Sequence, residues 1–205
     1  MNKSQPTLPK AIVMGASAGG VSALKTILCQ LDAAFSLPIV IALHLSPNTP
    51  SRLAALLDQA CPLSVKEAEE GEALCDGTVY LAAANYHLLV ETNGTLSFSV
   101  DARVCFSRPS IDILFESAAA AFGKQLIAVI LSGANQDGSA GIKKVAELGG
   151  ITLVQDPADA EMPDMPLAAL KAIQADYTLP VSALGSLLNQ FGAKRERKEH
   201  HHAIG

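Results

Sequence analysis

Ser17, His44 and Asp137 are the residues whose types and placement in this sequence could carry out catalysis. A serine hydroxyl attacks a carbonyl carbon when a neighbouring imidazole takes its proton, and a carboxylate then orients that imidazole. Each of the three closely follows a short apolar run. The carboxyl ends of parallel strands meet at one edge of a sheet, so we expect the three side chains to converge there.

The candidate nucleophile lies in the segment Gly15-Ala16-Ser17-Ala18-Gly19-Gly20, which satisfies the pattern G-x-S-x-G. Small flanking residues permit a sharp strand-to-helix turn that presents the hydroxyl beside helix N-terminal amides. A structural glycine turn or a phosphate loop would give the same pattern. A dinucleotide site is disfavoured, because the glycines do not make G-x-G-x-x-G and His44 stands where the ribose-binding acid is expected.

The base and the acid each have a competing interpretation. His87 is a rival for His44, but it falls in a segment of alternating polarity, where we expect a half-exposed surface position. Asp137 opens Asp-Gly-Ser-Ala-Gly and could simply be the N-cap of the following helix. The chain order Ser, His, Asp differs from the Ser, acid, His order of the common α/β-hydrolase fold, which indicates a separate family.

The elements that must position these residues alternate between strand and helix. Uncharged runs typical of buried parallel strands are Ala11–Met14, Leu37–Leu43, Leu126–Leu131 and Ile151–Val154. Helical spacing is found in Val21–Leu31, Arg52–Ala60 (with Asn48 or Thr49 as cap and Pro50 near the first turn), Ile111–Phe122, Ile142–Leu148, Leu167–Ala175 and Ser182 to about Lys194. His87–Thr92 and Leu96–Val100 flank Asn93-Gly94, a hairpin turn signal. The pattern predicts a doubly wound, mostly parallel α/β sheet flanked by helices on both faces, with an antiparallel hairpin at one edge.

Composition bounds the remaining possibilities. A chain of 205 residues with 49% hydrophobic residues can bury a full core, and its formal net charge of -5 argues against a general electrostatic grip on nucleic acid. Four widely spaced cysteines without a C-x-x-C pair fit reduced cytoplasmic thiols. The apolar stretch before Ala16-Ser17-Ala18 is too short for a signal peptide, and no run has membrane-spanning length.

Three segments are expected: an N-terminal extension (1–10), a catalytic domain (11–193) and a charged tail (194–205). The tail contains three consecutive histidines that could bind metal, but a frayed, solvated helix end is the favoured interpretation.

Ordered blocks along the chain carry a more specific signal. They are Gly15–Gly20, His44-Leu45-Ser46-Pro47, Val65-Lys66-Glu67-Ala68, Arg108-Pro109-Ser110-Ile111-Asp112 and Ser132–Gly141. Through them the sequence, from about Ala11 to about Pro180, resembles the catalytic domain of the chemotaxis protein-glutamate methylesterase (CheB) family. The resemblance implies Ser17 as nucleophile, His44 as base, Asp137 as orienting acid, and backbone amides near Ala18 and Ala134 as oxyanion donors.

The resemblance also implies the reaction and its partner. The expected substrate is the methylated cytoplasmic domain of a chemoreceptor, with no cofactor, no metal, no nucleic acid and no membrane insertion. Glutamine deamidation is a second expected activity, and a non-catalytic receptor-binding scaffold is the alternative class. Arg108 is a candidate contact for an acidic receptor surface, although a solvated arginine beside Pro109 fits equally.

Departures from the family pattern bear on specificity and control. Ala18 stands where the family usually has Thr, and Asn48-Thr49-Pro50 stands where it usually has a Gly-Phe-Thr-like segment. Family members commonly carry an N-terminal receiver domain, whereas ten residues precede the first predicted strand here. The expected enzyme is therefore a stand-alone catalytic domain without phosphorylation control in the same chain.

Overall fold

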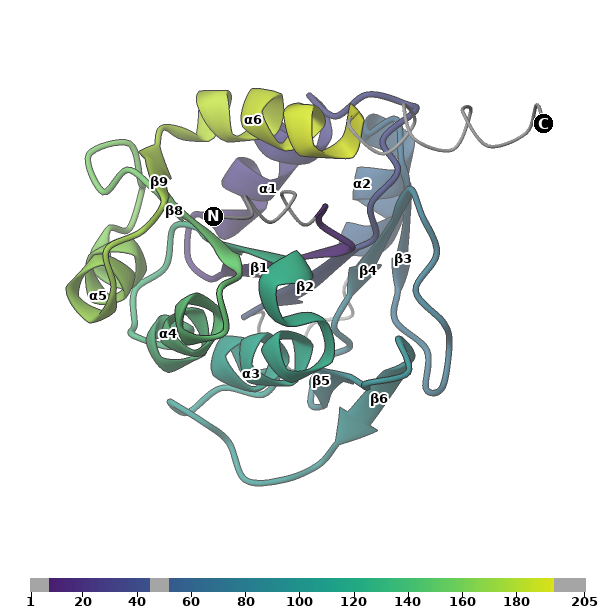
Figure 1. The fold of residues 1–205 in the computed structure, drawn as a ribbon, viewed down its shortest axis with the longest axis horizontal. Helices are drawn as coiled ribbons and strands as arrows, with labels where there is room; N and C mark the ends of the chain where they lie inside the picture. Colours follow the sequence, from purple (N-terminus) through teal and green to yellow (C-terminus); the bar gives the residue numbers. More distant parts are fainter. Residues whose placement is uncertain (1–7, 45–51, 194–205) are drawn as a thin grey trace, which may run out of the picture.

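A seven-stranded parallel sheet with helices on both faces forms the body of the molecule (Figure 1). The computed structural model describes residues 8–44 and 52–193. Its strands are β1 (Ala11–Ala16), β2 (Ile39–Leu43), β3 (Ser64–Glu67), β4 (Thr78–Leu81), β5 (His87–Val90), β6 (Leu96–Ser99), β7 (Leu126–Ile130), β8 (Ile151–Gln155) and β9 (Tyr177–Leu179). Its helices are α1 (Gly20–Leu28), α2 (Leu53–Ala60), α3 (Ile111–Phe122), α4 (Ser139–Glu147), α5 (Asp164–Ala172) and α6 (Val181–Ala193), with a 3-10 turn at Gly123–Gln125.

The strand order β3-β4-β2-β1-β7-β8-β9 places β2, β1 and β7 at the centre of the sheet. Side chains of β1 alternate between two cores, with Ile12 and Met14 in one and Val13 in the other. The first core is closed by α1, α2 and α6, and the second by α3, α4 and α5. Both faces of the central strands are therefore buried, which is why these strands are apolar at nearly every position.

The doubly wound parallel sheet and its flanking helices are confirmed, and the element boundaries differ in ways that have local causes. β2 begins at Ile39 rather than Leu37, because Pro38 has no N–H to donate to a neighbouring strand. α5 begins at Asp164 rather than Leu167, since Pro166 is accepted in a first turn whose N–H groups need no intrahelical partner. α4 begins at Ser139 rather than Ile142, after Gly138 with a φ of 95°.

The predicted hairpin is present, but its place in the fold is not the predicted one. β5 and β6 pair antiparallel and form a two-stranded sheet of their own instead of extending an edge of the large sheet. They lie beside α3 in Figure 1 and pack on it through Leu88, Val90 and Leu96. The hairpin therefore belongs to the layer that covers one face.

The sequence patterns missed the short strands β3, β4 and β9, and some predictions fall outside the described residues. These are the caps at Asn48 or Thr49 with Pro50, most of the N-terminal extension (1–7) and the charged tail (194–205). No helix in the described part of the chain is long and apolar enough to cross a membrane.

All four cysteines are free thiols, as expected. Cys29 and Cys61, at the carboxyl ends of α1 and α2, have their sulfur atoms 3.0 Å apart. Burial and the neighbouring thiol raise the pKa of Cys61 to about 12, so this sulfur stays protonated at neutral pH.

Candidate active site

The central strands deliver Ser17 and His44 to the same edge of the sheet. The register pairs Ala16 of β1 with Leu43 of β2, so Ser17 and His44 are the next residues on adjacent parallel strands. Such strands are about 4.8 Å apart. The His44 backbone N–H donates to the carbonyl of Ala16 at 3.1 Å, which fixes the two backbones to each other.

Close backbone packing holds the turn that carries Ser17. Its N–H donates to the carbonyl of Ser132 at 2.9 Å, which links it to the segment after β7. A Cβ on Gly133 would lie 3.0 Å from the Ser17 Cβ and 2.5 Å from the Met165 Cε, so a side chain there would require the end of the Met165 side chain to move. Gly19 has a φ of 76° and precedes α1 directly. The glycines serve the turn by allowing this close approach and the left-handed conformation.

His44 is joined to Asp137 by a short hydrogen bond. The distance from His44 Nε2 to Asp137 Oδ2 is 2.8 Å, and the two side chains are 10% and 0% exposed. An ionised carboxylate can only accept, so Nε2 carries the proton and Nδ1 is the acceptor of the neutral ring. This arrangement exchanges the roles that the two ring nitrogens have in chymotrypsin-type triads.

The acceptor nitrogen of His44 faces two polar side chains that the sequence reasoning did not single out. The Ser107 hydroxyl lies 3.3 Å and the Asn135 amide 3.4 Å from Nδ1. Among the hydrogen bonds of residues 8–44 and 52–193, none joins the Ser17 hydroxyl to His44. The nucleophile and base candidates are thus neighbours that are not yet bonded, as is common in enzymes without substrate.

Asp137 is a buried carboxylate with a full set of donors. Its Oδ1 accepts from the Ser110 hydroxyl (2.9 Å) and the Asp112 N–H (3.0 Å), and its Oδ2 accepts from the Ile111 N–H (2.8 Å) as well as from His44. Burial alone would raise the pKa of Asp137, but these bonds, led by the one from His44, hold it below its usual value. Asp137 is therefore ionised at neutral pH.

Asp137 does not cap the helix that follows it. The N-cap of α4 is Gly138, while Asp137 binds the first N–H groups of α3, a helix that lies earlier in the chain. The simple N-cap interpretation of Asp137 is therefore wrong for its own helix. The carboxylate instead ties the segment after β7 to the N-terminus of α3 and to His44.

Among residues 8–44 and 52–193, two backbone N–H groups next to Ser17 have no acceptor. In the described part of the chain, no carbonyl or side chain accepts from the N–H of Ala18 or of Ala134. Both residues are exposed, and Ala134 follows the glycine that touches Ser17. Free N–H groups in this place are what the binding of an oxyanion requires.

The structure revises the expectations for His87 and Arg108. His87 is 0% exposed rather than half-exposed, since Nε2 donates to the Ala102 carbonyl and Nδ1 accepts from the Ser110 N–H. Arg108 is half-buried: it folds onto its own loop, where its Nη1 donates to the carbonyls of Val100 and Asp101. The sequence around His87 and Arg108 did not indicate these hydrogen-bond partners.

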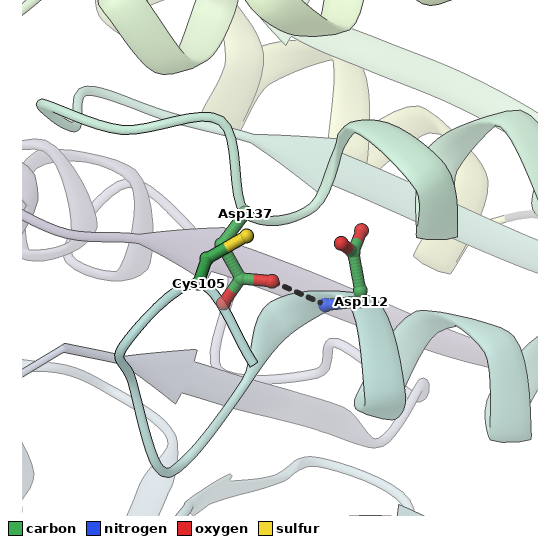
Figure 2. Close-up of side chains that lie close together, drawn as sticks. All are labelled: Cys105, Asp112 and Asp137. Atoms are coloured by element: carbon green, nitrogen blue, oxygen red, sulfur yellow. Dashed lines mark hydrogen bonds between the residues drawn. The ribbon is translucent and has the colours of Figure 1, made fainter. Parts of the chain in front are cut away.

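Cys105, Asp112 and Asp137 offer a sulfur and two carboxylates within 4.8 Å of one another, a donor set that could attract a metal ion (Figure 2). Each oxygen of Asp137 already accepts two hydrogen bonds, and Oδ1 of Asp112 accepts the Gly141 N–H at 2.7 Å. Burial raises the pKa of the Cys105 thiol, and the two carboxylates raise it further. The chemistry of these donors therefore fits a hydrogen-bonded structural centre better than a metal site.

A pocket of about 470 Å³ opens beside His44. Its lining includes Asn135, which contacts the imidazole, and Phe106, which is 95% exposed. Cys105 and Phe106 both have positive φ, in a tight turn closed by the bridge between Val104 and Ser107. The turn that presents Ser107 to His44 thus also forms one wall of the pocket.

Comparisons with known proteins agree on one family. The sequence profile of the CheB methylesterase family matches residues 12–188. A Leptospira interrogans protein is 48% identical over 178 residues, which is 87% of this chain and 92% of that protein. That protein is named, as a provisional assignment, a protein-glutamate methylesterase/protein-glutamine glutaminase. Protein-glutamate methylesterase FrzG of Myxococcus xanthus is 36% identical over 92% of this chain and 56% of its own length. The crystal structure of the Thermotoga maritima CheB methylesterase catalytic domain matches with a TM-score of 0.85 at 33% identity, covering 90% of this chain and 99% of that one.

Proposed function

The chain belongs to the CheB methylesterase family, and from this premise we propose that it hydrolyses glutamate methyl esters on chemoreceptors, with Ser17 as nucleophile, His44 as base and Asp137 as orienting acid. The observation that carries the proposal is the imidazole–carboxylate pair, 2.8 Å apart, on the strand next to the one that presents Ser17. Residues 11–193 would form the catalytic domain, and the matched segment 12–188 lies within it.

In the first half of the reaction Ser17 Oγ attacks the ester carbonyl carbon while its proton passes to His44 Nδ1. The carbonyl π bond opens and leaves a negative charge on the oxygen, which the N–H groups of Ala18 and Ala134 can bind. Collapse of this intermediate breaks the bond to the methoxy oxygen, and that oxygen takes the proton from His44. Methanol leaves, and the glutamyl group stays on Ser17 as an ester.

Water completes the cycle by the same route. His44 Nδ1 removes a proton from water, the hydroxide attacks the glutamyl carbonyl, and the second oxyanion collapses with return of the proton to Ser17 Oγ. The products are a free glutamate side chain and the original enzyme. No redox step or cofactor enters this balance.

Asp137 and its donors support both proton transfers. Because Asp137 stays ionised, it keeps the proton of the neutral ring on Nε2 and stabilises the imidazolium that forms after each transfer. Ser107 and Asn135 would release Nδ1 when Ser17 or water approaches it. Their contacts orient the imidazole before the reaction and are replaced when Nδ1 binds Ser17 or water.

The substrate is proposed to be the methylated cytoplasmic domain of a chemoreceptor, which would place the reaction in the cytoplasm. The pocket beside His44 is open to solvent and lined by Phe106, Asn135 and Gln136, so a segment of a folded protein can reach it. Arg108 keeps a proposed role in contacting an acidic receptor surface, although its Nη1 is already engaged by the loop.

Glutamine deamidation is a second candidate activity, favoured by relatives whose names pair a methylesterase with a protein-glutamine glutaminase. The same attack by Ser17 on a side-chain amide would release ammonia instead of methanol. Ammonia and methanol assays on the same receptor fragments separate the two activities.

Replacement of Ser17 with alanine tests the proposal directly. The wild-type protein should release methanol from purified, methylated receptor fragments, and Ser17→Ala should reduce that rate to background while its thermal unfolding stays unchanged. Ser22→Ala, an exposed serine two residues into α1, is the matched control and should behave as wild type. Methanol release that persists in Ser17→Ala would refute the assigned nucleophile. A wild-type protein that binds receptor but releases neither methanol nor ammonia would indicate the scaffold alternative.

A further inference from the structure

Two buried carboxylates cross between the N-termini of α3 and α4. Asp137, just before α4, accepts from the N–H groups of Ile111 and Asp112 in the first turn of α3. Asp112, in that first turn, accepts through Oδ1 from the N–H of Gly141 in the first turn of α4, at 2.7 Å. Figure 2 shows the two side chains next to each other with the bond from the Asp112 N–H. Asp137 thus satisfies N–H groups at the start of α3, the helix that carries Asp112. Asp112 in turn satisfies an N–H group at the start of α4, the helix that follows Asp137.

The close approach of the two helices depends on a glycine. A Cβ on Gly141 would lie 2.6 Å from the Phe115 Cβ and 3.0 Å from the Asp112 Cα and carbonyl oxygen. With no side chain there, the backbone of α4 comes near enough for the Asp112 carboxylate to reach it. Asp112 is 9% exposed, so the pair of crossed bonds is closed off from water.

The crossed arrangement has an electrostatic cost. The pKa of Asp112 is raised to about 6: burial raises it most, the negative charges of Asp137 and Glu116 also raise it, and the N–H groups of Gly141 and Gly138 oppose the rise. Glu116 faces it from the next turn of α3, and Cys105 from the turn at 104–107. At neutral pH Asp112 is therefore mostly ionised next to an ionised Asp137, although an uncharged side chain would be easier to bury.

We propose that Asp112 is a positioning residue for the reaction: its bond to α4 fixes the Asp137 carboxylate against the His44 imidazole, and its charge adds to the negative field that favours the imidazolium. The role rests on the proposed function, because it acts through His44 as base. Among the described residues Asp112 has no hydrogen bond to His44 or Ser17, so it acts through Asp137.

Two substitutions separate the mechanical part of this role from the electrostatic part. Asp112→Asn keeps an oxygen for the Gly141 N–H and leaves its own N–H on Asp137, but removes the charge. Asp112→Ala removes both the charge and the acceptor. Glu116→Gln removes an equal charge from an exposed position one turn along α3 and is the matched control.

The expected results differ for each variant. Asp112→Ala should lower kcat for methanol release about 10- to 100-fold with little change in KM, because the bond that ties α3 to the start of α4, next to Asp137, is lost and the carboxylate is positioned less precisely. Asp112→Asn should recover most of that loss, while the acid limb of its pH–rate profile moves to lower pH by several tenths of a unit. Glu116→Gln should move it less.

An NMR titration of the His44 ring gives a readout that does not depend on substrate. Its midpoint should fall in Asp112→Asn and stay close to wild type in Glu116→Gln. Equal midpoints in wild type and Asp112→Asn, or a folded Asp112→Ala variant with wild-type kcat, would overturn the positioning role. A wild-type protein that releases no methanol would instead count against the proposed function, and the NMR comparison would still decide whether Asp112 acts on His44.

Discussion

The two described histidines, His44 at the carboxyl edge of the sheet and His87 in the hairpin, are connected through the start of α3, His87 directly and His44 by way of Asp137, but have opposite surroundings. His87 binds the Ser110 N–H, the Ser110 hydroxyl binds Asp137, and Asp137 binds His44. His87 is completely buried between backbone groups, while His44 is 10% exposed and paired with a carboxylate. One continuous chain of hydrogen bonds thus includes both rings.

The difference shows which surroundings make an imidazole a candidate base. Both nitrogens of His87 are committed to backbone groups, so a change in its protonation would break a buried bond. His44 has a charged partner that stabilises the protonated ring and an acceptor nitrogen that faces only weakly bound side chains. The residue type is the same, and the partners decide between structure and chemistry.

Replacing His44 and His87 in turn with glutamine should separate their two roles most clearly. His44→Gln retains an amide that can donate to Asp137 but has no basic nitrogen, so kcat for methanol release should fall on the order of 10⁴-fold or more. The free energy of unfolding, measured with urea, should change little because His44 lies at the rim of the sheet. A variant that keeps a tenth of wild-type turnover would show that His44 is not the base.

His87→Gln should have the opposite profile. A flexible amide cannot serve the Ser110 N–H and the Ala102 carbonyl with the geometry of the ring, so the free energy of unfolding should fall by about 1–3 kcal/mol. Turnover at a temperature where the variant is folded should drop less than about tenfold, since Asp137 keeps its other donors. Loss of turnover equal to that of His44→Gln would contradict a structural role for His87.

The pH dependence of the free energy of unfolding is the last test of the comparison. It arises because ionisable carboxylates lie at the His44 end of the chain of hydrogen bonds. The pKa of Asp112 is raised from 3.8 to about 6, so the folded state binds its proton more tightly than the unfolded state. The stabilising effect of that proton is complete below pH 3.8 and is lost as the pH rises through 6. Asp137, with its lowered pKa, acts in the reverse sense: its contribution is present above its usual pKa and is lost only at lower pH.

Urea unfolding at pH 4.5 and pH 7 measures this effect. Asp112→Asn lacks the titration, so its stability relative to wild type should improve between the two pH values, on the order of 1–3 kcal/mol. Glu116→Gln should show a smaller change. A relative stability that stays constant between the two pH values would mean that Asp112 is not an electrostatic cost to the fold.

Much of the fold could be predicted from the sequence because the central strands are buried on both faces. Ala11–Ala16 and Leu126–Ile130 are apolar along their whole length, and this pattern is hard to mistake for a loop. The strands β3 and β9 are three or four residues long with exposed positions, so they have no such run. β4 has only four residues, too few for a periodic signal to separate strand from other structure.

The candidate site likewise contains residues that could be predicted from the sequence and residues that could not. His44 and Asp137 were expected at one rim because both follow central strands, and there they lie 2.8 Å apart. Ser107 and Asn135 come from loops, and their contact with His44 depends on the left-handed turn at Cys105 and Phe106 and on the path after β7. The burial of His87 was missed because alternation assigns a side chain to a face of a strand but does not say what packs on that face.

The contact between Gly133 and Ser17 also limits how this site can be redesigned. Any larger residue at position 133 would displace the end of the Met165 side chain and press on the Ser17 Cβ, so substitutions there would disturb the turn that carries the nucleophile. Mutational libraries aimed at new ester substrates should leave residue 133 unchanged and vary Phe106 and Gln136, whose side chains line the solvent-open pocket.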